Sequence, residues 1–107
     1  MRAFRLTGWQ QPPELVDVSR PVAGPGEVLV RVAGCGLCHS DLSMMAMPAE
    51  LGASLGWAMP FTLGHETAGW VETVGDGVDG YTSGDPVALV SPAFCGACRW
   101  CVAGKQN

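Results

Sequence analysis

The chain has 107 residues, of which 48% are hydrophobic and 15% charged, a composition typical of one globular domain or part of one. Its net charge of −4 argues against nucleic acid or an anionic membrane surface as the main partner. There is no apolar run of the roughly 20 residues that span a bilayer and no signal-peptide core after Met1, so we expect a cytoplasmic protein with no nucleic-acid and no membrane partner.

The first half of the chain predicts short strands and one helix. Residues 4–6 and 15–18 are the weaker strand candidates. Residues 27–32 form a stronger one, because Val28, Val30 and Val32 alternate onto one face and turn glycines flank the run. Residues 40–47 are the best helical candidate, with Ser40 as the expected N-cap and Pro48 as the stop.

The second half continues the β pattern. Residues 49–60 are expected to form a glycine-containing loop that carries Trp57. Residues 69–74 are rich in β-branched and aromatic side chains, predict a strand and end at a Gly-Asp-Gly turn. Residues 87–90 predict a further strand directly after Pro86. With 15 glycines and 8 prolines among short strands, a small β-barrel is the expected architecture.

Five cysteines fall into two groups, Cys35 and Cys38, then Cys95, Cys98 and Cys101. In a reducing compartment such spacing favours metal binding or catalysis over disulfides. The Cys-x-x-Cys of the first group also allows a thioredoxin-like redox pair, but that function needs a βαβ setting that this β-rich pattern does not supply. We therefore interpret Cys35 as a small buried apolar residue.

A cluster of chemically active residues lies around two glycine turns. A catalytic zinc needs a few nitrogen or sulfur ligands and one open position for water or substrate. A ligating imidazole also needs an acceptor on its other nitrogen, which Asp41 or Glu66 could supply. A nearby hydroxyl such as that of Ser40 could relay a proton from an alcohol to solvent. The residues of this cluster are Cys38, His39, Ser40, Asp41, His65 and Glu66.

Three motifs carry a specific resemblance that covers essentially all 107 residues. They are Gly64-His65-Glu66-Thr67-Ala68-Gly69 with Gly75 and Val78 behind it, Cys38-His39-Ser40-Asp41 upstream, and Gly84-Asp85-Pro86-Val87. In combination they resemble the zinc-dependent alcohol dehydrogenases of the medium-chain dehydrogenase/reductase family. The resemblance implies a mainly β, partly open chaperonin-10-like (GroES-like) barrel with short helices that carries the metal. In the family a Rossmann domain that binds NAD or NADP follows it.

The resemblance also assigns residues to a metal site. Cys38 and His65 would be ligands of the catalytic zinc. Glu66 would be the carboxylate beside the metal, described in the family as catalytic or as an alternative ligand. Asp41 would orient the His65 ring without binding the metal itself.

Other residues are assigned by the resemblance to proton transfer, cofactor and substrate. Ser40 would be the catalytic hydroxyl of the proton relay. His39 would lie near the cofactor pyrophosphate or further along that relay. Trp57 would fall in the loop that lines the substrate pocket. Apolar residues near this loop favour primary or secondary alcohols over polyols, although they could equally be core: Met44, Met45, Met59 and Phe61.

The second cysteine group has the spacing of a tetrahedral zinc site. Cys95, Cys98 and Cys101 can converge on one zinc if a fourth ligand closes it. In the resembled family this is the structural zinc lobe, whose fourth cysteine would lie beyond Asn107. Three surface thiols without metal are the alternative.

The sequence contains no Gly-x-Gly-x-x-Gly fingerprint, and in the family the third catalytic zinc ligand lies well beyond residue 107. We therefore expect residues 1–107 to be an N-terminal zinc-binding catalytic domain, incomplete, without its nucleotide-binding domain and inactive alone. The intact enzyme would oxidise primary or secondary alcohols to aldehydes or ketones with zinc and NAD or NADP, as a homo-oligomer. Sorbitol, formaldehyde and threonine dehydrogenases share this plan. A chaperonin-10-like co-chaperone and a stand-alone zinc or thiol module are alternatives from other classes.

Overall fold

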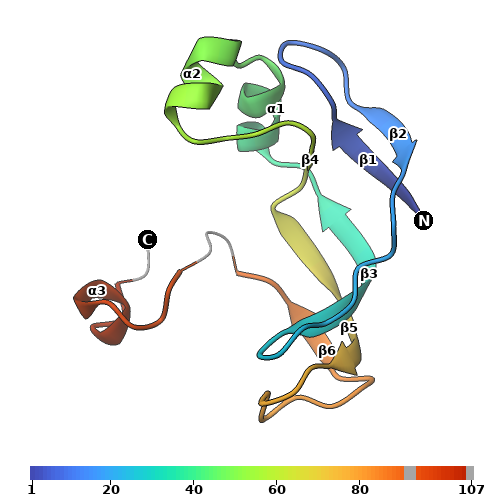
Figure 1. Ribbon diagram of the computed structural model, residues 1–107, viewed down its shortest axis with the longest axis vertical. Helices are drawn as coiled ribbons and strands as arrows, with labels where there is room; N and C mark the ends of the chain where they lie inside the picture. The colour runs from blue at the N-terminus through green and yellow to red at the C-terminus, as the bar shows by residue number, and fades with distance from the viewer. Residues whose placement is uncertain (91–93, 106–107) are drawn as a thin grey trace.

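The computed structural model describes residues 1–90 and 94–105, and its strands form two three-stranded antiparallel sheets (Figure 1). The first sheet has the order β2 (Glu14–Asp17), β1 (Arg2–Leu6), β4 (Phe61–Thr62). The second has the order β3 (Val28–Gly36), β5 (Glu66–Val74), β6 (Pro86–Ala88). Neither sheet closes on itself, which agrees with a mainly β, partly open architecture rather than a closed barrel.

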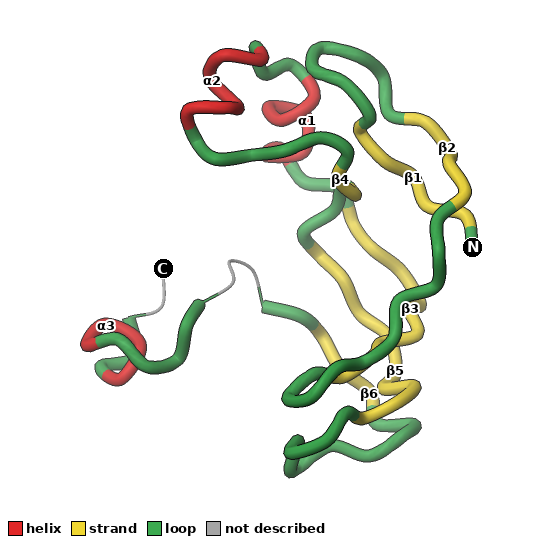
Figure 2. Tube along the Cα trace, viewed as in Figure 1, coloured by secondary structure: helices red, strands yellow, loops and turns green. Residues whose placement is uncertain are grey.

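Three short helices complete the described elements: α1 (His39–Met45), α2 (Ala49–Ser54) and α3 (Arg99–Val102). The first two lie together beyond the end of β3, whereas α3 stands apart from both sheets (Figure 2). No helix in the described part of the chain is long and apolar enough to cross a membrane.

The expected strands are confirmed, with shifted ends. The run 27–32 begins one residue before β3, and residues 69–74 lie in β5. Both strands extend beyond the predicted runs, and Gly36 at the end of β3 pairs with Glu66 at the start of β5. Residues 4–6 and 15–18 lie in or beside β1 and β2, and the strand predicted at 87–90 is the shorter β6.

Two register shifts interrupt the pairing of β3 with β5, one between Leu29 and Val30 and one between Val32 and Gly34. Such bulges bend a strand and increase its twist. At Gly69 the strands approach so closely that a Cβ atom would meet the Arg31 carbonyl and lie 3.0 Å from the Cα of Val32. This position therefore requires glycine for steric reasons.

The first helix begins earlier than the sequence suggested, and the expected Ser40 N-cap is wrong. Cys38 is the N-cap residue, and α1 ends at Met45. The cause is Asp41, whose side chain accepts a hydrogen bond from the Cys38 amide at 2.8 Å. A carboxylate at the third helical position satisfies one of the amides that a helix start leaves open.

The loop expected at residues 49–60 is wrong in its first half, because α2 occupies Ala49–Ser54. Pro48 is its N-cap, and proline near a helix start removes no intrahelical hydrogen bond. The helix ends in a Schellman motif, in which Gly56 has φ 75° and the amides of Gly56 and Trp57 bond to the Ala53 and Gly52 carbonyls at 3.0 Å. Proline and glycine thus mark the boundaries of this helix.

The core is small. Leu6, Leu63 and Val71 are the buried large apolar side chains among the described residues. Asp41 is the buried charged side chain, with no accessible surface. A carboxylate buried in so small a core requires hydrogen-bond donors around it, and these donors define the candidate site.

Candidate metal centre

The pairing of β3 with β5 brings two distant segments together. Because Gly36 pairs with Glu66, the chain that leaves β3 toward Cys38 lies beside the chain that enters β5 from His65. The His65 amide donates to the Gly36 carbonyl at 3.3 Å, which fixes this junction. Residues 27 positions apart thereby face each other at one end of the sheet.

The Asp41 carboxylate holds the two segments of this junction together. Its Oδ2 accepts from the Cys38 amide at 2.8 Å, and its Oδ1 accepts from the Gly64 amide at 2.7 Å and lies 3.0 Å from Nδ1 of His65. Burial alone raises the pKa of the Asp41 carboxyl, but the hydrogen bonds from Cys38, His65 and Gly64 outweigh it and hold that pKa at about 2. The carboxylate is therefore ionised and acts as an acceptor only.

The donor atoms of Cys38, Asp41 and His65 all lie within 4.8 Å of one another. Cys38 Sγ is 3.8 Å from Nδ1 of His65. Since Asp41 already accepts three hydrogen bonds, the groups left to bind a metal are the thiol and Nε2 of the imidazole. Thiolate sulfur and imidazole nitrogen are the donors that zinc prefers, and an imidazole held at Nδ1 by a carboxylate is the usual arrangement around a bound zinc. The residues present thus fit a zinc ion.

Ser40 and His39 lie at the start of α1, and both are exposed. Ser40 Oγ is 2.7 Å from Cys38 Sγ, so the hydroxyl lies directly beside the thiol. The His39 carbonyl accepts from Ser43 Oγ at 3.2 Å, which is a contact within the helix. The hydrogen bonds of the described residues thus join Ser40, but not the His39 ring, to the thiol of Cys38.

Glu66 does not belong to the group of three donors. Its exposed side chain lies over Gly36, where a Cβ atom would come within 3.0 Å of the Glu66 Cβ. The acceptor for His65, which the sequence left open between Asp41 and Glu66, is Asp41 in this structure.

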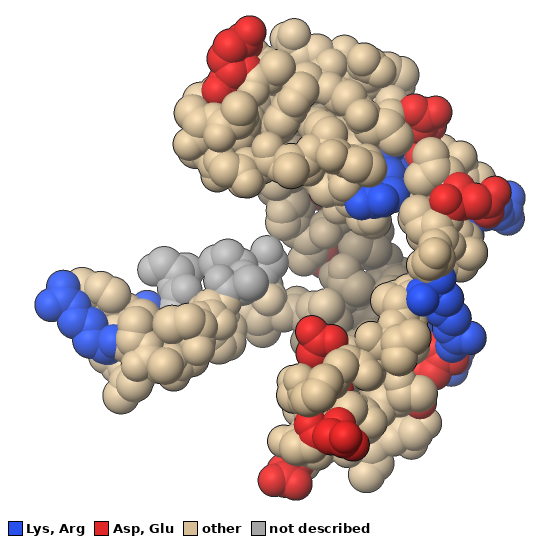
Figure 3. Space-filling view, in the orientation of Figure 1, with Lys and Arg blue, Asp and Glu red and all other residues tan. Residues whose placement is uncertain are grey.

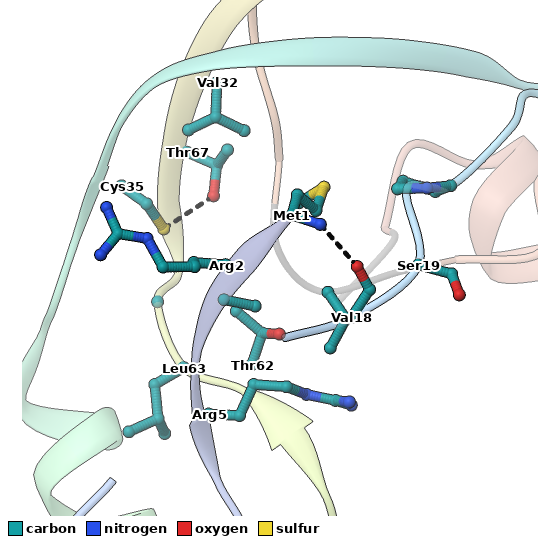
Figure 4. Close-up of a pocket in the computed structure, with 13 residues that line it drawn as sticks. Met1, Arg2, Arg5, Val18, Ser19, Val32, Cys35, Thr62, Leu63 and Thr67 are labelled. Carbon is teal, nitrogen blue, oxygen red and sulfur yellow. Dashed lines mark hydrogen bonds between the residues drawn. The ribbon is translucent and has the colours of Figure 1, made fainter. Parts of the chain in front are cut away.

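Cys35 is exposed, so the expectation that it is buried is wrong. Its Sγ lies 2.9 Å from Oγ1 of Thr67 across the β3–β5 pair, on the wall of a cavity of about 670 Å³ that β1 lines from the other side (Figure 4). Among the described residues Cys35 and Cys38 are free cysteines whose sulfur atoms contact different partners, Thr67 for Cys35 and Ser40 and His65 for Cys38.

Trp57 lines a separate apolar cavity of about 220 Å³. Met44 of α1, Ala58 after α2 and Phe61 of β4 complete the lining. The Trp57 and Phe61 rings meet edge to face with centroids 6.2 Å apart. Of the apolar residues suspected from the sequence, Met44 and Phe61 therefore join Trp57, while Met45 and Met59 do not line this cavity.

The three cysteines of the second group converge around α3. Cys101 Sγ lies 3.8 Å from Cys95 Sγ and 3.5 Å from Cys98 Sγ. Two ligands of a tetrahedral zinc with Zn–S bonds of about 2.3 Å are about 3.8 Å apart, so this spacing fits zinc. Hydrogen bonds from the Ala97 and Cys98 amides, with smaller contributions from the neighbouring thiols, lower the pKa of Cys95 to about 7, and contacts to Cys101 lower that of Cys98. Thiolates therefore form readily here.

Residues 24–107 match the family described as "Alcohol dehydrogenase GroES-like domain". The chain belongs to this family. It is 38% identical over 110 residues to an NAD-dependent alcohol dehydrogenase of Sulfurisphaera tokodaii, a match that spans 100% of this chain and 32% of the relative. It is also 38% identical over 106 residues to an S-(hydroxymethyl)glutathione dehydrogenase of Photobacterium damsela subsp. piscicida, spanning 99% and 27%.

Solved structures agree with this family assignment. The alcohol dehydrogenase of Aeropyrum pernix superposes with a TM-score of 0.84 at 38% identity, over 96% of this chain and 30% of that one. A cobalt- and zinc-bound thermostable alcohol dehydrogenase from Pyrobaculum aerophilum gives a TM-score of 0.82 at 37% identity, over 99% and 31%. The chain therefore spans about a third of the length of the alcohol dehydrogenases it matches.

The sequence places Gly64 in a motif but predicts no role for it in the site. Gly64 donates its amide to Asp41 and has φ 115°, a conformation that favours glycine. A Cβ there would also collide with Cys35 Sγ. The glycine directly before His65 was the available signal, and only the fold shows that its amide binds the carboxylate.

Proposed function

We propose that this chain is the zinc-binding catalytic part of an alcohol dehydrogenase that oxidises primary or secondary alcohols with NAD or NADP. The observation that carries the proposal is the group formed by Cys38, His65 and the buried Asp41, whose donor atoms lie within 4.8 Å of one another. The relatives described above support it. A nucleotide-binding domain and a further zinc ligand would come from polypeptide outside these 107 residues.

Each residue of the junction has a separate task in this proposal. Asp41 keeps a proton on Nδ1 of His65 and fixes the ring plane, so that Nε2 offers its lone pair in one direction. Cys38 offers its sulfur from the N-cap position of α1, beside the Ser40 hydroxyl. A zinc ion held by these two donors would supply Lewis-acid polarisation of an alcohol oxygen, and the nicotinamide would supply the hydride acceptor.

Ser40 is the proposed proton acceptor. Its hydroxyl lies 2.7 Å from Cys38 Sγ and is open to solvent, so it can take a proton from an alcohol hydroxyl near the thiol and release one to water. His39, one residue earlier and exposed, is the proposed next carrier or a contact for the cofactor pyrophosphate. Glu66 is proposed to act electrostatically from outside the donor group.

The apolar cavity supports a substrate class. Met44, Trp57 and Phe61 present no charge, so the cavity of about 220 Å³ favours an alcohol with an apolar substituent over a polyol. Homo-oligomeric assembly of the intact enzyme is part of the same proposal.

A chimaeric enzyme tests this proposal. Residues 1–107 would replace the matching third of the Aeropyrum pernix alcohol dehydrogenase, and alcohol-dependent reduction of NAD and NADP would be measured. We expect a zinc-dependent activity that Ser40→Ala lowers about 100-fold, a usual contribution of general acid–base catalysis, at unchanged zinc content. Ser54→Ala on α2 is the matched control and should keep full activity. Equal activity of both serine variants would remove Ser40 from proton transfer.

A further inference from the structure

The segment 6–10, at the end of β1 and directly after it, lies beside the elements that carry the apolar cavity (Figure 1). At its start Leu6, which has no accessible surface, pairs with Phe61 of β4. Phe61 forms one wall of the cavity, so the pairing of β1 with β4 fixes the position of that wall. The segment then leaves the sheet and contacts α1 and α2.

The half-buried ring of Trp9 lies against the backbone of α2 at Gly52. A Cβ atom at Gly52 would overlap three carbon atoms in the six-membered ring of the indole, Cη2, Cζ3 and Cζ2. Glycine is an unfavourable residue inside a helix, and here it gives the indole room to reach the helix backbone. Gly52 is the buried residue of α2, so the ring covers the buried side of this helix.

The residue under the ring also positions Trp57. The Gly52 carbonyl accepts a hydrogen bond from the Trp57 amide at 3.0 Å, in the Schellman motif that ends α2. Trp57 forms a second wall of the cavity and meets the Phe61 ring edge to face. Trp9 is not one of the described residues that line the cavity, so its effect on the cavity passes through Gly52 and Trp57.

The next residue of the segment contacts the other helix. Nε2 of Gln10 donates to the Ala46 carbonyl at the C-terminal end of α1, in a long hydrogen bond of 3.5 Å. Gln10 has φ 53°, a conformation that non-glycine residues adopt only where surrounding contacts hold it. Met44, two residues before Ala46, forms a third wall of the cavity. The segment 6–10 thus contacts the chain next to each of these three walls.

The contacts of the segment with the helices are packing and hydrogen bonding. The described ion pairs, Arg20 with Glu72 and His65 with Asp41, do not join the segment 6–10 to either helix. Figure 3 shows mainly uncharged atoms over α1, α2 and the segment, with acidic atoms toward the edge. Raised salt, which screens exposed charges, should therefore leave these contacts intact.

We propose that Trp9 is a positioning residue that limits the size of the alcohol accepted by the apolar cavity. This rests on the proposed function, which takes the cavity as the alcohol site. Protein interiors are densely packed, so neighbours move into part of the space that a lost side chain leaves. Without the indole, α2 and Trp57 are free to shift relative to Phe61, which the sheet holds in place. The cavity then no longer has one fixed width.

The volume of the cavity indicates which alcohols distinguish the two states. A cavity of about 150 Å³ binds benzene. The cavity of about 220 Å³ therefore has room for one aromatic ring but is too small for two fused rings held in the same way. Benzyl alcohol and 2-naphthalenemethanol, both apolar primary alcohols, are the matching probes.

Binding of the two alcohols is measured on the full chain loaded with zinc, by NMR titration of the assigned Trp57 indole signal. We expect benzyl alcohol to bind at least about tenfold more tightly, the usual effect of a pocket that excludes a larger group. Trp9→Ala should reduce this preference about tenfold, whereas Trp9→Phe, which keeps a six-membered ring, should retain most of it. Trp70→Ala, the same truncation at an exposed tryptophan of β5, is the control and should leave the preference unchanged.

Gly52→Ala tests the contact from the other side. The added methyl group separates the indole from α2 and should also reduce the preference for benzyl alcohol. In the Trp9→Ala background the same change should have little effect, because residues in contact are coupled and the space beside Gly52 is then vacant. Circular dichroism checks the fold of each variant, and if Trp9→Ala does not fold, Gly52→Ala and Trp9→Phe decide the matter.

A preference for benzyl alcohol that Trp9→Ala and Gly52→Ala leave unchanged overturns the proposal. So does a wild-type chain that binds neither alcohol or binds both equally. Failure of the proposed function gives a different result: the chimaeric enzyme then oxidises neither alcohol, while binding to the chain still depends on Trp9. In an active chimaera, Trp9→Ala should change the ratio of the two KM values about tenfold and leave kcat for benzyl alcohol nearly unchanged, a split that general loss of stability does not produce.

Discussion

Replacing Asp41 with asparagine removes a negative charge from the interior while keeping the shape of the side chain. The carboxylate accepts from the amides of Cys38 and Gly64 at 2.8 and 2.7 Å and faces His65 at 3.0 Å. An asparagine oxygen placed toward Gly64 and His65 puts the amide nitrogen opposite the Cys38 amide, so two donors face each other. One buried amide then loses its acceptor at a cost of about 1–3 kcal/mol, and the other two hydrogen bonds lose their charge assistance.

The expected destabilisation is therefore about 2–4 kcal/mol. This is a large share of the free energy of unfolding of a native domain, which is about 5–15 kcal/mol. Urea denaturation of the full chain followed by circular dichroism measures it as a lower midpoint at unchanged slope. Asp85→Asn is the matched control, because Asp85 accepts one amide, that of Thr82, in a partly exposed turn. Its cost should stay below about 1 kcal/mol. If Asp41→Asn lowers the free energy of unfolding no more than the control does, the Asp41 carboxylate does not hold Cys38, Gly64 and His65 together.

Three further changes test the fold around the site. Gly69→Ala forces a Cβ into the backbone of β3 and should destabilise the chain by about 2 kcal/mol or more in the same urea assay; a neutral result would mean that the strands are further apart. Gly52→Ala should displace the Trp9 ring, which covers that position, and shift its indole N–H signal in NMR spectra, whereas an unmoved signal would contradict this packing. Arg20→Ala should raise the pKa of Glu72 in a carbon NMR titration, since the Arg20 hydrogen bond and charge lower it. The pair thus contributes stability above the unfolded pKa of Glu72 that is lost as the pH falls through the lowered value, and an unchanged titration would show that the pair does not form in solution.

Much of the candidate site could be predicted because its residues lie at the ends of recognisable strands. The alternating valines located β3, and the aromatic and β-branched run located β5. The resemblance to alcohol dehydrogenases then placed Cys38 and His65 together. The fold supplies the reason: antiparallel pairing of Gly36 with Glu66 brings the two segments side by side.

Other features depend on partners distant in sequence and could not be predicted. The N-cap moved from Ser40 to Cys38 because a buried carboxylate binds the Cys38 amide. The sequence did not predict helix α2, because proline and glycine are common in loops, whereas Pro48 and Gly56 lie at the two ends of this helix. Cys35 was expected in the core, yet the two sheets leave a cavity between them and the thiol lies on its wall.

The central claim, that Cys38 and His65 offer one metal site, is tested most directly by imidazole NMR during zinc titration. The chain has only two histidines, so His39 serves as an internal reference. We expect the Nε2 signal of His65 to move to a metal-bound position while Nδ1 stays protonated against Asp41, and His39 to remain unchanged. Cys38→Ser should weaken this response strongly, whereas Cys35→Ser should preserve it. A His65 signal that ignores zinc, or that responds equally in both cysteine variants, would contradict the account.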